Sequence, residues 1–139
     1  MVVTLLSVPG KTLLAGATGS YSRINQPMAD IAAVLRSQAE PPLILADSQH
    51  LAGNMRLQFP RAEVQRLGDW QDALASPPAG PVLLIWGAGD DADAAPPAEI
   101  DAILQGRAAT PSAAGRIERP YLFSGGKRQF SLSYLWLGQ

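Results

Sequence analysis

Short apolar runs alternate along this chain with segments in which apolar residues recur at helical spacing. The runs 43–46 and 82–86 contain only apolar residues, which is typical of strands buried on both faces of a parallel sheet. A weaker apolar pattern at 63–67 predicts a third strand. The predicted helices span residues 27–38, 49–59, 69–75 and 98–108.

The last part of the chain follows a different pattern. Two strands are predicted at 117–123 and 129–137, joined by a turn that contains Gly125 and Gly126, and residues 110–115 before them are predicted to form a loop. In the second strand Ser131 and Ser133 alternate with apolar residues, which predicts one apolar face and one wetter face.

Together these elements predict the fold class. Alternating helices and strands are typical of a three-layer α/β domain with a mostly parallel sheet and helices on both faces. The two final strands add a C-terminal antiparallel hairpin. Trp86 and Trp136 lie at strand positions and are predicted to be buried, whereas Trp70 lies in a polar stretch and is predicted to be exposed.

Composition narrows the functional classes. The chain has 139 residues, of which 47% are hydrophobic, and this suits a single domain with a real core. Its formal net charge is −1, so no basic field is expected to attract nucleic acid. The absence of cysteine excludes a disulfide framework, a thiol nucleophile and a Cys-ligated zinc site.

Three glycine- or aspartate-containing segments are incomplete versions of ligand-binding motifs. Residues 9–12 end like a phosphate-binding loop, but Leu5 replaces its first glycine. Residues 87–89 follow a strand as a dinucleotide fingerprint does, but aspartates crowd the following loop and would repel a pyrophosphate. Those aspartates also lack the spacing of a calcium loop, since Ala95 replaces a ligand. We therefore expect no cofactor and no metal.

The candidate substrate-binding residues are Asp47, Ser48 and Asn54. Asp47 and Ser48 directly follow a predicted parallel strand, and open α/β sheets bind ligands at the carboxyl ends of such strands. The loop at 87–89 is expected on the same rim, with Asn54 further along the helix. The competing interpretation is that Asp47 or Ser48 only caps the next helix, and we favour capping for Asp47. His50, the single histidine, is predicted to be an ordinary surface residue.

Most of residues 20–137 resemble one family, the bacterial membrane glycosyltransferases that use polyprenyl-phosphate sugars. This family includes aminoarabinose transferases of lipid A and protein mannosyltransferases. In its members a strand that ends in Ala-Asp leads into a helix that contains Leu-Ala and ends at an aromatic residue followed by Pro. The corresponding positions here are Ala46-Asp47, Leu51-Ala52 and Phe59-Pro60, and Tyr21-Ser22-Arg23 and Gln26-Pro27 resemble the family's link between its last membrane helix and its external domain.

The resemblance implies a C-terminal soluble domain on the periplasmic side of the bacterial inner membrane. Residues 1–22 would be the remnant of a membrane helix and residues 23–139 a single α/β domain. Because the family's catalytic carboxylates lie in its membrane part, no catalytic residue carries over to this chain. The expected partners are the membrane-embedded part of the same protein and a lipid-linked sugar or glycan acceptor. A free-standing small α/β enzyme and a non-enzymatic binding module remain the alternatives.

Overall fold

The computed structural model describes residues 26–89, 95–106, 111–122 and 129–138. The predicted apolar segment 1–22, the aspartate-rich stretch 90–93 and the glycine pair of the predicted hairpin turn lie outside the described residues. The division into residues 1–22 and 23–139 therefore stays a prediction. No helix in the described part of the chain has the length and apolar character that crossing a membrane requires.

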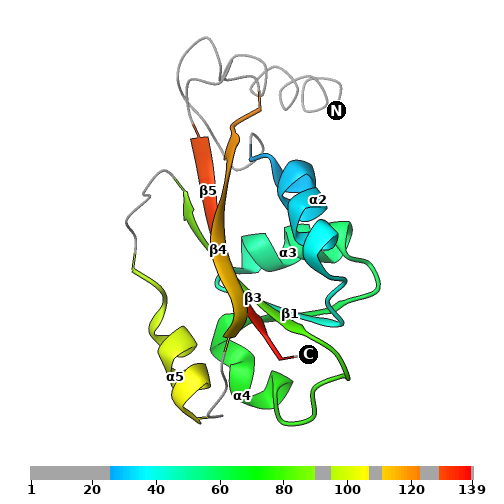
Figure 1. Ribbon diagram of the computed structural model, residues 1–139, viewed down its shortest axis with the longest axis vertical. Coiled ribbons are helices and arrows are strands. Elements are labelled where there is room, and N and C mark those ends of the chain that lie inside the picture. The colour runs from blue at the N-terminus through cyan, green and yellow to red at the C-terminus, as the bar shows by residue number, and fades with distance from the viewer. Residues whose placement is uncertain (1–25, 90–94, 107–110, 123–128, 139) are drawn as a thin grey trace, which may run out of the picture.

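The described residues form an α/β fold around one five-stranded sheet (Figure 1). In chain order the elements are α2 (Met28–Gln38), β1 (Leu43–Ala46), α3 (Gln49–Gln58), β2 (Glu63–Arg66), the 3₁₀ turn η2 (Leu67–Asp69), α4 (Trp70–Ala73), β3 (Val82–Gly89), α5 (Ala98–Gly106), β4 (Pro111–Pro120) and β5 (Gln129–Leu137). The strand order is β2-β1-β3-β5-β4. This confirms the predicted α/β class.

The sheet is more evenly mixed than predicted. Strand β1 pairs in parallel with β2 and β3, whereas β5 pairs antiparallel with both β3 and β4. The predicted parallel pairing of 43–46 with 82–86 is confirmed, with Leu43 opposite Val82 and Ala46 opposite Ile85. The expectation of a mostly parallel sheet is wrong because both C-terminal strands are long and supply half of the pairings.

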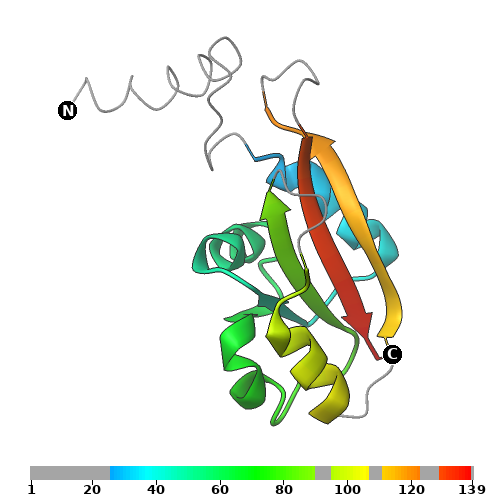
Figure 2. The same cartoon turned by 90° about the vertical axis from the view of Figure 1, so that its left-hand side faces the viewer.

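Helices cover both faces of the sheet (Figures 1 and 2). On one face, Ile44, Leu83 and Leu132 share a buried cluster with residues of α2 and α3. On the other face, Leu45 and Leu84 pack with residues of α4 and α5. Successive strand residues point to opposite faces, so strands β1 and β3 contribute to both clusters. Burying each such Leu or Ile side chain stabilises the fold by about 1.5–3 kcal/mol.

Strand β4 begins earlier than expected. The predicted loop at 110–115 is wrong, because Pro111–Pro120 is a strand that pairs along the full length of β5. Its side chains give no hydrophobic signal, since only Ile117 is buried. Prolines stand at its two ends and the strand lies at the sheet edge, which is where a missing N–H is tolerated.

Strand β5 does not have the wetter face that was predicted for it. Ser131 and Ser133 are only 4% and 8% exposed. They share their face with Leu135 and Leu137, which pack in the same buried cluster as α5. The prediction was wrong because β5 is an interior strand, flanked by β3 and β4, with helices over both faces. Trp86 and Trp136 are buried as predicted, whereas Trp70 is half-buried against the cluster on the α5 face.

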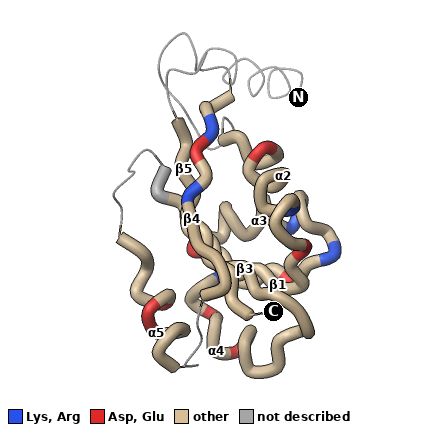
Figure 3. Tube along the Cα trace, viewed as in Figure 1, with Lys and Arg blue, Asp and Glu red and all other residues tan. Residues whose placement is uncertain are grey.

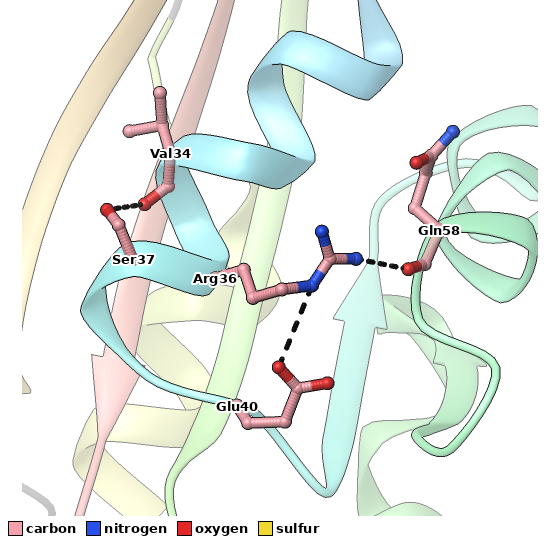
Figure 4. A network of polar contacts seen from close by, with 5 residues as sticks. All are labelled: Val34, Arg36, Ser37, Glu40 and Gln58. Carbon is pink, nitrogen blue, oxygen red and sulfur yellow. Dashed lines mark hydrogen bonds and ion pairs between the residues drawn. The ribbon is translucent and has the colours of Figure 1, made fainter.

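Arg36 connects α2 to the end of α3 (Figure 4). Its guanidinium group donates a hydrogen bond to the backbone carbonyl of Gln58, the last residue of α3. The same group lies 4.9 Å from the centre of the Phe59 ring and 3.8 Å from a carboxylate oxygen of Glu40. The exposed ion pair contributes little by itself, but the bond to Gln58 satisfies a carbonyl that the helix end leaves without an intrahelical partner.

Helix α3 begins with a side-chain cap supplied by Ser48. The Ser48 hydroxyl oxygen accepts a hydrogen bond from the backbone N–H of Leu51 at 3.1 Å. We expect Ser48→Ala to lower the free energy of unfolding by about 1 kcal/mol, measured by urea denaturation. Ser48→Asp, which supplies another capping oxygen, should restore most of the loss. Equal stability of Ser48→Ala and the wild type would show that the cap contributes nothing.

Candidate functional site

The predicted rim lies where the parallel strands β1 and β3 end. The backbone N–H of Asp47 donates to the carbonyl of Ile85 at 3.1 Å and so extends the ladder between the two strands by one residue. In return, the Asp47 carboxylate accepts from the backbone N–H of Gly87 at 3.2 Å. The structure therefore brings Asp47 and the start of the 87–89 segment together, as the strand-end argument predicted.

The capping role predicted for Asp47 is wrong. Ser48 is the N-cap of α3, and the Asp47 side chain instead joins the ends of two strands. Asp47 does not cap the helix because its backbone still pairs with β3, through its N–H and the carbonyl of Ile85. From this position its carboxylate reaches the backbone N–H of Gly87 on β3. The predicted loop that begins at Gly87 is also shorter than expected, since residues 87–89 continue strand β3.

Asn54 is not part of this rim in its contacts. Its side-chain amide donates to the backbone carbonyl of His50, one turn earlier on the same helix, at 3.0 Å. The ring nitrogen Nε2 of His50 lies 3.1 Å from the amide oxygen of Gln26 and 3.3 Å from the Asn54 amide nitrogen. His50 is therefore half-buried in an amide network between α3 and Gln26, two residues before α2, and is not an ordinary surface residue.

The electrostatics of the rim are acidic. Burial raises the pKa of the Asp47 carboxyl group, and the negative charge of Glu99 raises that pKa further. The backbone N–H groups of Gly87 and Asp47 act in the opposite direction, but burial dominates. Neither of the two ion pairs found among the described residues, Arg36–Glu40 and Arg66–Asp69, involves these carboxylates.

Sequence reasoning did not place Glu99 near this rim. Glu99 lies in the first turn of α5, the helix that follows β3. In a strand–helix unit the chain leaves the sheet at the carboxyl end of the strand, so the start of the helix returns near that edge. The acidic residue at the start of the predicted helix was the available signal. Charges elsewhere in the described residues are scattered over several elements rather than gathered in one field (Figure 3).

The hydrogen bonds at the rim have structural roles. The Ser48 oxygen is engaged with Leu51 and the His50 ring with Gln26 and Asn54, so a Ser–His–Asp triad finds no support in this geometry. Within the described residues, no group of three His, Asp or Glu side chains is arranged to hold a metal ion. The polar atoms near Asp47 fasten strand ends and a helix start.

Comparison with known proteins shows which class of protein this chain resembles. The chain is homologous, along its whole length, to a portion of bacterial glycosyltransferases of the cell envelope. It is 34% identical over 144 residues to the lipopolysaccharide core galacturonosyltransferase RgtA of Rhizobium johnstonii. This alignment covers 99% of this chain and 28% of that enzyme. It is 32% identical over 146 residues to RgtB, the lipopolysaccharide core galacturonosyltransferase of the same organism, covering 100% of this chain and 29% of the enzyme.

The chain thus spans less than a third of the length of these two relatives. No family model and no solved structure matches it. The resemblance to bacterial glycosyltransferases, which covers most of residues 20–137, is supported at the level of a transferase.

The raised pKa of Asp47 predicts how one substitution changes stability with pH. Because the folded state holds this proton more tightly than the unfolded state, the free energy of unfolding falls as pH rises from the ordinary value of 3.8 through the raised pKa. Asp47→Asn removes the titration and keeps an oxygen for Gly87. We therefore expect the free energy of unfolding of this variant, relative to that of the wild type, to increase as the pH rises from acidic to neutral.

Urea denaturation of both proteins at pH 3.5 and pH 7 tests this expectation. Asp69→Asn is the matched control, because the Asp69 carboxylate is exposed and paired with Arg66. A stability difference between Asp47→Asn and wild type that stays constant with pH would contradict the raised pKa.

Proposed function

We propose that this chain is a non-catalytic domain of a membrane-bound glycosyltransferase that modifies the lipopolysaccharide core. The observation that carries the proposal is the whole-length similarity to one portion of two galacturonosyltransferases. In this proposal the parent enzyme transfers a uronic acid residue from a polyprenyl-phosphate donor to the core oligosaccharide. The domain faces the periplasm, contacts the membrane-embedded part of the same protein, and assists binding of acceptor or donor or stabilises the enzyme.

The contacts of the rim support a non-catalytic role. A general acid or base needs a proton-transfer partner within hydrogen-bond reach in the substrate complex. Here Asp47 holds the end of β3, Ser48 holds the start of α3, and Asn54 holds its own helix. Each of the three candidate residues therefore has a structural contact that accounts for its position, and the catalytic groups are proposed to lie outside this chain.

The activity of the parent protein is the direct test. We expect deletion of the parent gene to remove a galacturonosyl residue from the lipopolysaccharide core, and the intact gene supplied in trans to restore it. Mass spectrometry of the released core oligosaccharide measures both. An unchanged core in the deletion strain would contradict the proposed substrate class, and activity of this chain alone on a lipid-linked sugar would contradict its non-catalytic role.

Substitution of Asp47 in the intact parent tests the role of the rim. We expect Asp47→Asn to retain transfer within about twofold, because the amide oxygen still accepts from Gly87, whereas loss of a catalytic acid or base costs about 10²- to 10⁴-fold. Transfer per molecule is measured in membranes, with enzyme abundance determined by immunoblotting. Asp69→Asn is the control on the same domain. A folded and abundant Asp47→Asn enzyme without activity would assign Asp47 to substrate.

A further inference from the structure

An open groove of about 350 Å³ lies between the C-terminal end of α2 and strands β4 and β5. Its lining residues are Gln38, Ala39, Ser112, Ala113, Tyr134 and Trp136. The volume falls within the range of about 300–1,000 Å³ found for small-molecule sites. The groove is separate from the rim at Asp47: Trp136 pairs with Leu83 near the start of β3, whereas the rim lies at the end of that strand.

Gln38 organises the groove through its side-chain amide. The indole N–H of Trp136 donates to the amide oxygen at 2.9 Å, and the amide nitrogen donates to the Tyr134 hydroxyl oxygen at 3.0 Å. Since an indole nitrogen is only a donor, the amide oxygen must face Trp136 and the amide nitrogen must face Tyr134. These two hydrogen bonds therefore orient all three side chains toward one another without any ligand.

These contacts leave defined hydrogen-bonding capacity in the groove. Tyr134 accepts from Gln38 and keeps its own hydroxyl proton to donate, and the Gln38 amide has a second N–H. The Ser112 hydroxyl donates to the backbone carbonyl of Trp136 at 3.3 Å and keeps lone pairs to accept. Donors and an acceptor thus lie beside apolar surface from the Tyr134 ring and two alanine methyl groups.

A glycine on β4 permits this arrangement. Gly115 stands directly opposite Tyr134 in the antiparallel pair. A Cβ atom at position 115 would lie 2.8 Å from the Tyr134 hydroxyl oxygen, closer than non-bonded atoms approach. The tyrosine ring lies across β4 toward Gln38 because residue 115 has no side chain.

We propose that this groove binds a neutral saccharide unit, which is part of the glycan acceptor if the proposed transferase function holds. Sugar hydroxyls both donate and accept hydrogen bonds, and sugar C–H faces pack on aromatic and methyl surface, so both kinds of lining are used. No Lys, Arg, Asp or Glu is among the lining residues. A phosphate or a uronate carboxylate would lose water there without gaining a cationic partner.

Titration of the full 139-residue chain with saccharides tests the proposal. The probes are the methyl glycosides of glucose, galactose and mannose, and lactose, compared with digalacturonic acid and inorganic phosphate. Two-dimensional ¹H–¹⁵N NMR follows the Trp136 indole and the Gln38 side-chain amide. At least one neutral probe is expected to shift both signals at millimolar concentration, with little effect from the anions.

Two substitutions locate the site. Tyr134→Phe removes the hydroxyl and keeps the ring, and should weaken binding about 3- to 10-fold, as expected for one lost hydrogen bond. Tyr121→Phe is the matched control, because Tyr121 lies beyond the opposite end of β4 and should leave the titration unchanged. Ala113→Leu fills the groove from an exposed edge-strand position and should abolish binding without disturbing the core.

Each outcome decides the proposal. Absence of shifts with every neutral probe at tens of millimolar overturns it, as does stronger binding of phosphate or digalacturonic acid. Equal binding by wild type, Tyr134→Phe and Ala113→Leu overturns the location. These readouts are independent of transfer by the parent: a chain that binds no saccharide in a strain that still makes the modified core removes only this inference. Conversely, saccharide binding with an unchanged core in the deletion strain removes only the proposed transferase function.

Discussion

Burial of β1 and β3 on both faces is the constraint on which the rest of this fold depends. All four residues of β1 are fully inaccessible to solvent. A strand in that position has no water to satisfy its backbone, so both of its edges must be paired and both of its faces covered. Strands β2 and β3 pair with the two edges of β1. Helices α2 and α3 cover one face of the sheet, and α4 and α5 cover the other.

The end of a doubly buried strand creates a local problem that Asp47 and Ser48 solve in succession. Where the chain leaves the sheet, the N–H of Gly87 on β3 has lost its strand partner, and the first N–H groups of α3 have no intrahelical acceptor. The Asp47 carboxylate accepts a hydrogen bond from the Gly87 N–H, and the Ser48 hydroxyl accepts one from the Leu51 N–H in the first turn of α3. Partial burial and the nearby charge of Glu99 raise the Asp47 pKa despite the hydrogen bond from Gly87, so the charged carboxylate carries an electrostatic cost that a neutral amide would avoid. A polar pair at a strand end is therefore accounted for by backbone satisfaction without a ligand.

Apolar content determined which elements could be predicted. Residues 43–46 and 129–137 emerge as strands at their predicted bounds because their side chains are buried and the sequence shows it. The first half of β4 was missed because an edge strand with exposed Ser, Ala and Gly is specified by its partner and not by its own side chains. Ser131 and Ser133 lie between β3 and β4 in the sheet, and this interior position depends on strand pairings that the residues of β5 alone do not reveal. The strand-end rim could be predicted from topology alone, whereas the link from Gln38 to Tyr134 and Trp136 joins residues 96 and 98 positions apart and has no local signal.

Unused hydrogen-bonding capacity distinguishes the two polar surfaces of the domain. At the rim, the side chains of Asp47 and Ser48 accept hydrogen bonds from backbone N–H groups of β3 and α3, and a ligand would compete with those contacts. In the groove, the internal contacts of Gln38 orient the Tyr134 hydroxyl and the amide while leaving protons on both to donate. A preorganised group with an open donor loses little conformational freedom when it binds. Recognition on this domain is therefore better supported at the edge of the sheet, where a glycine gives a tyrosine room to lie across β4, than at the strand ends where α/β folds usually bind their ligands.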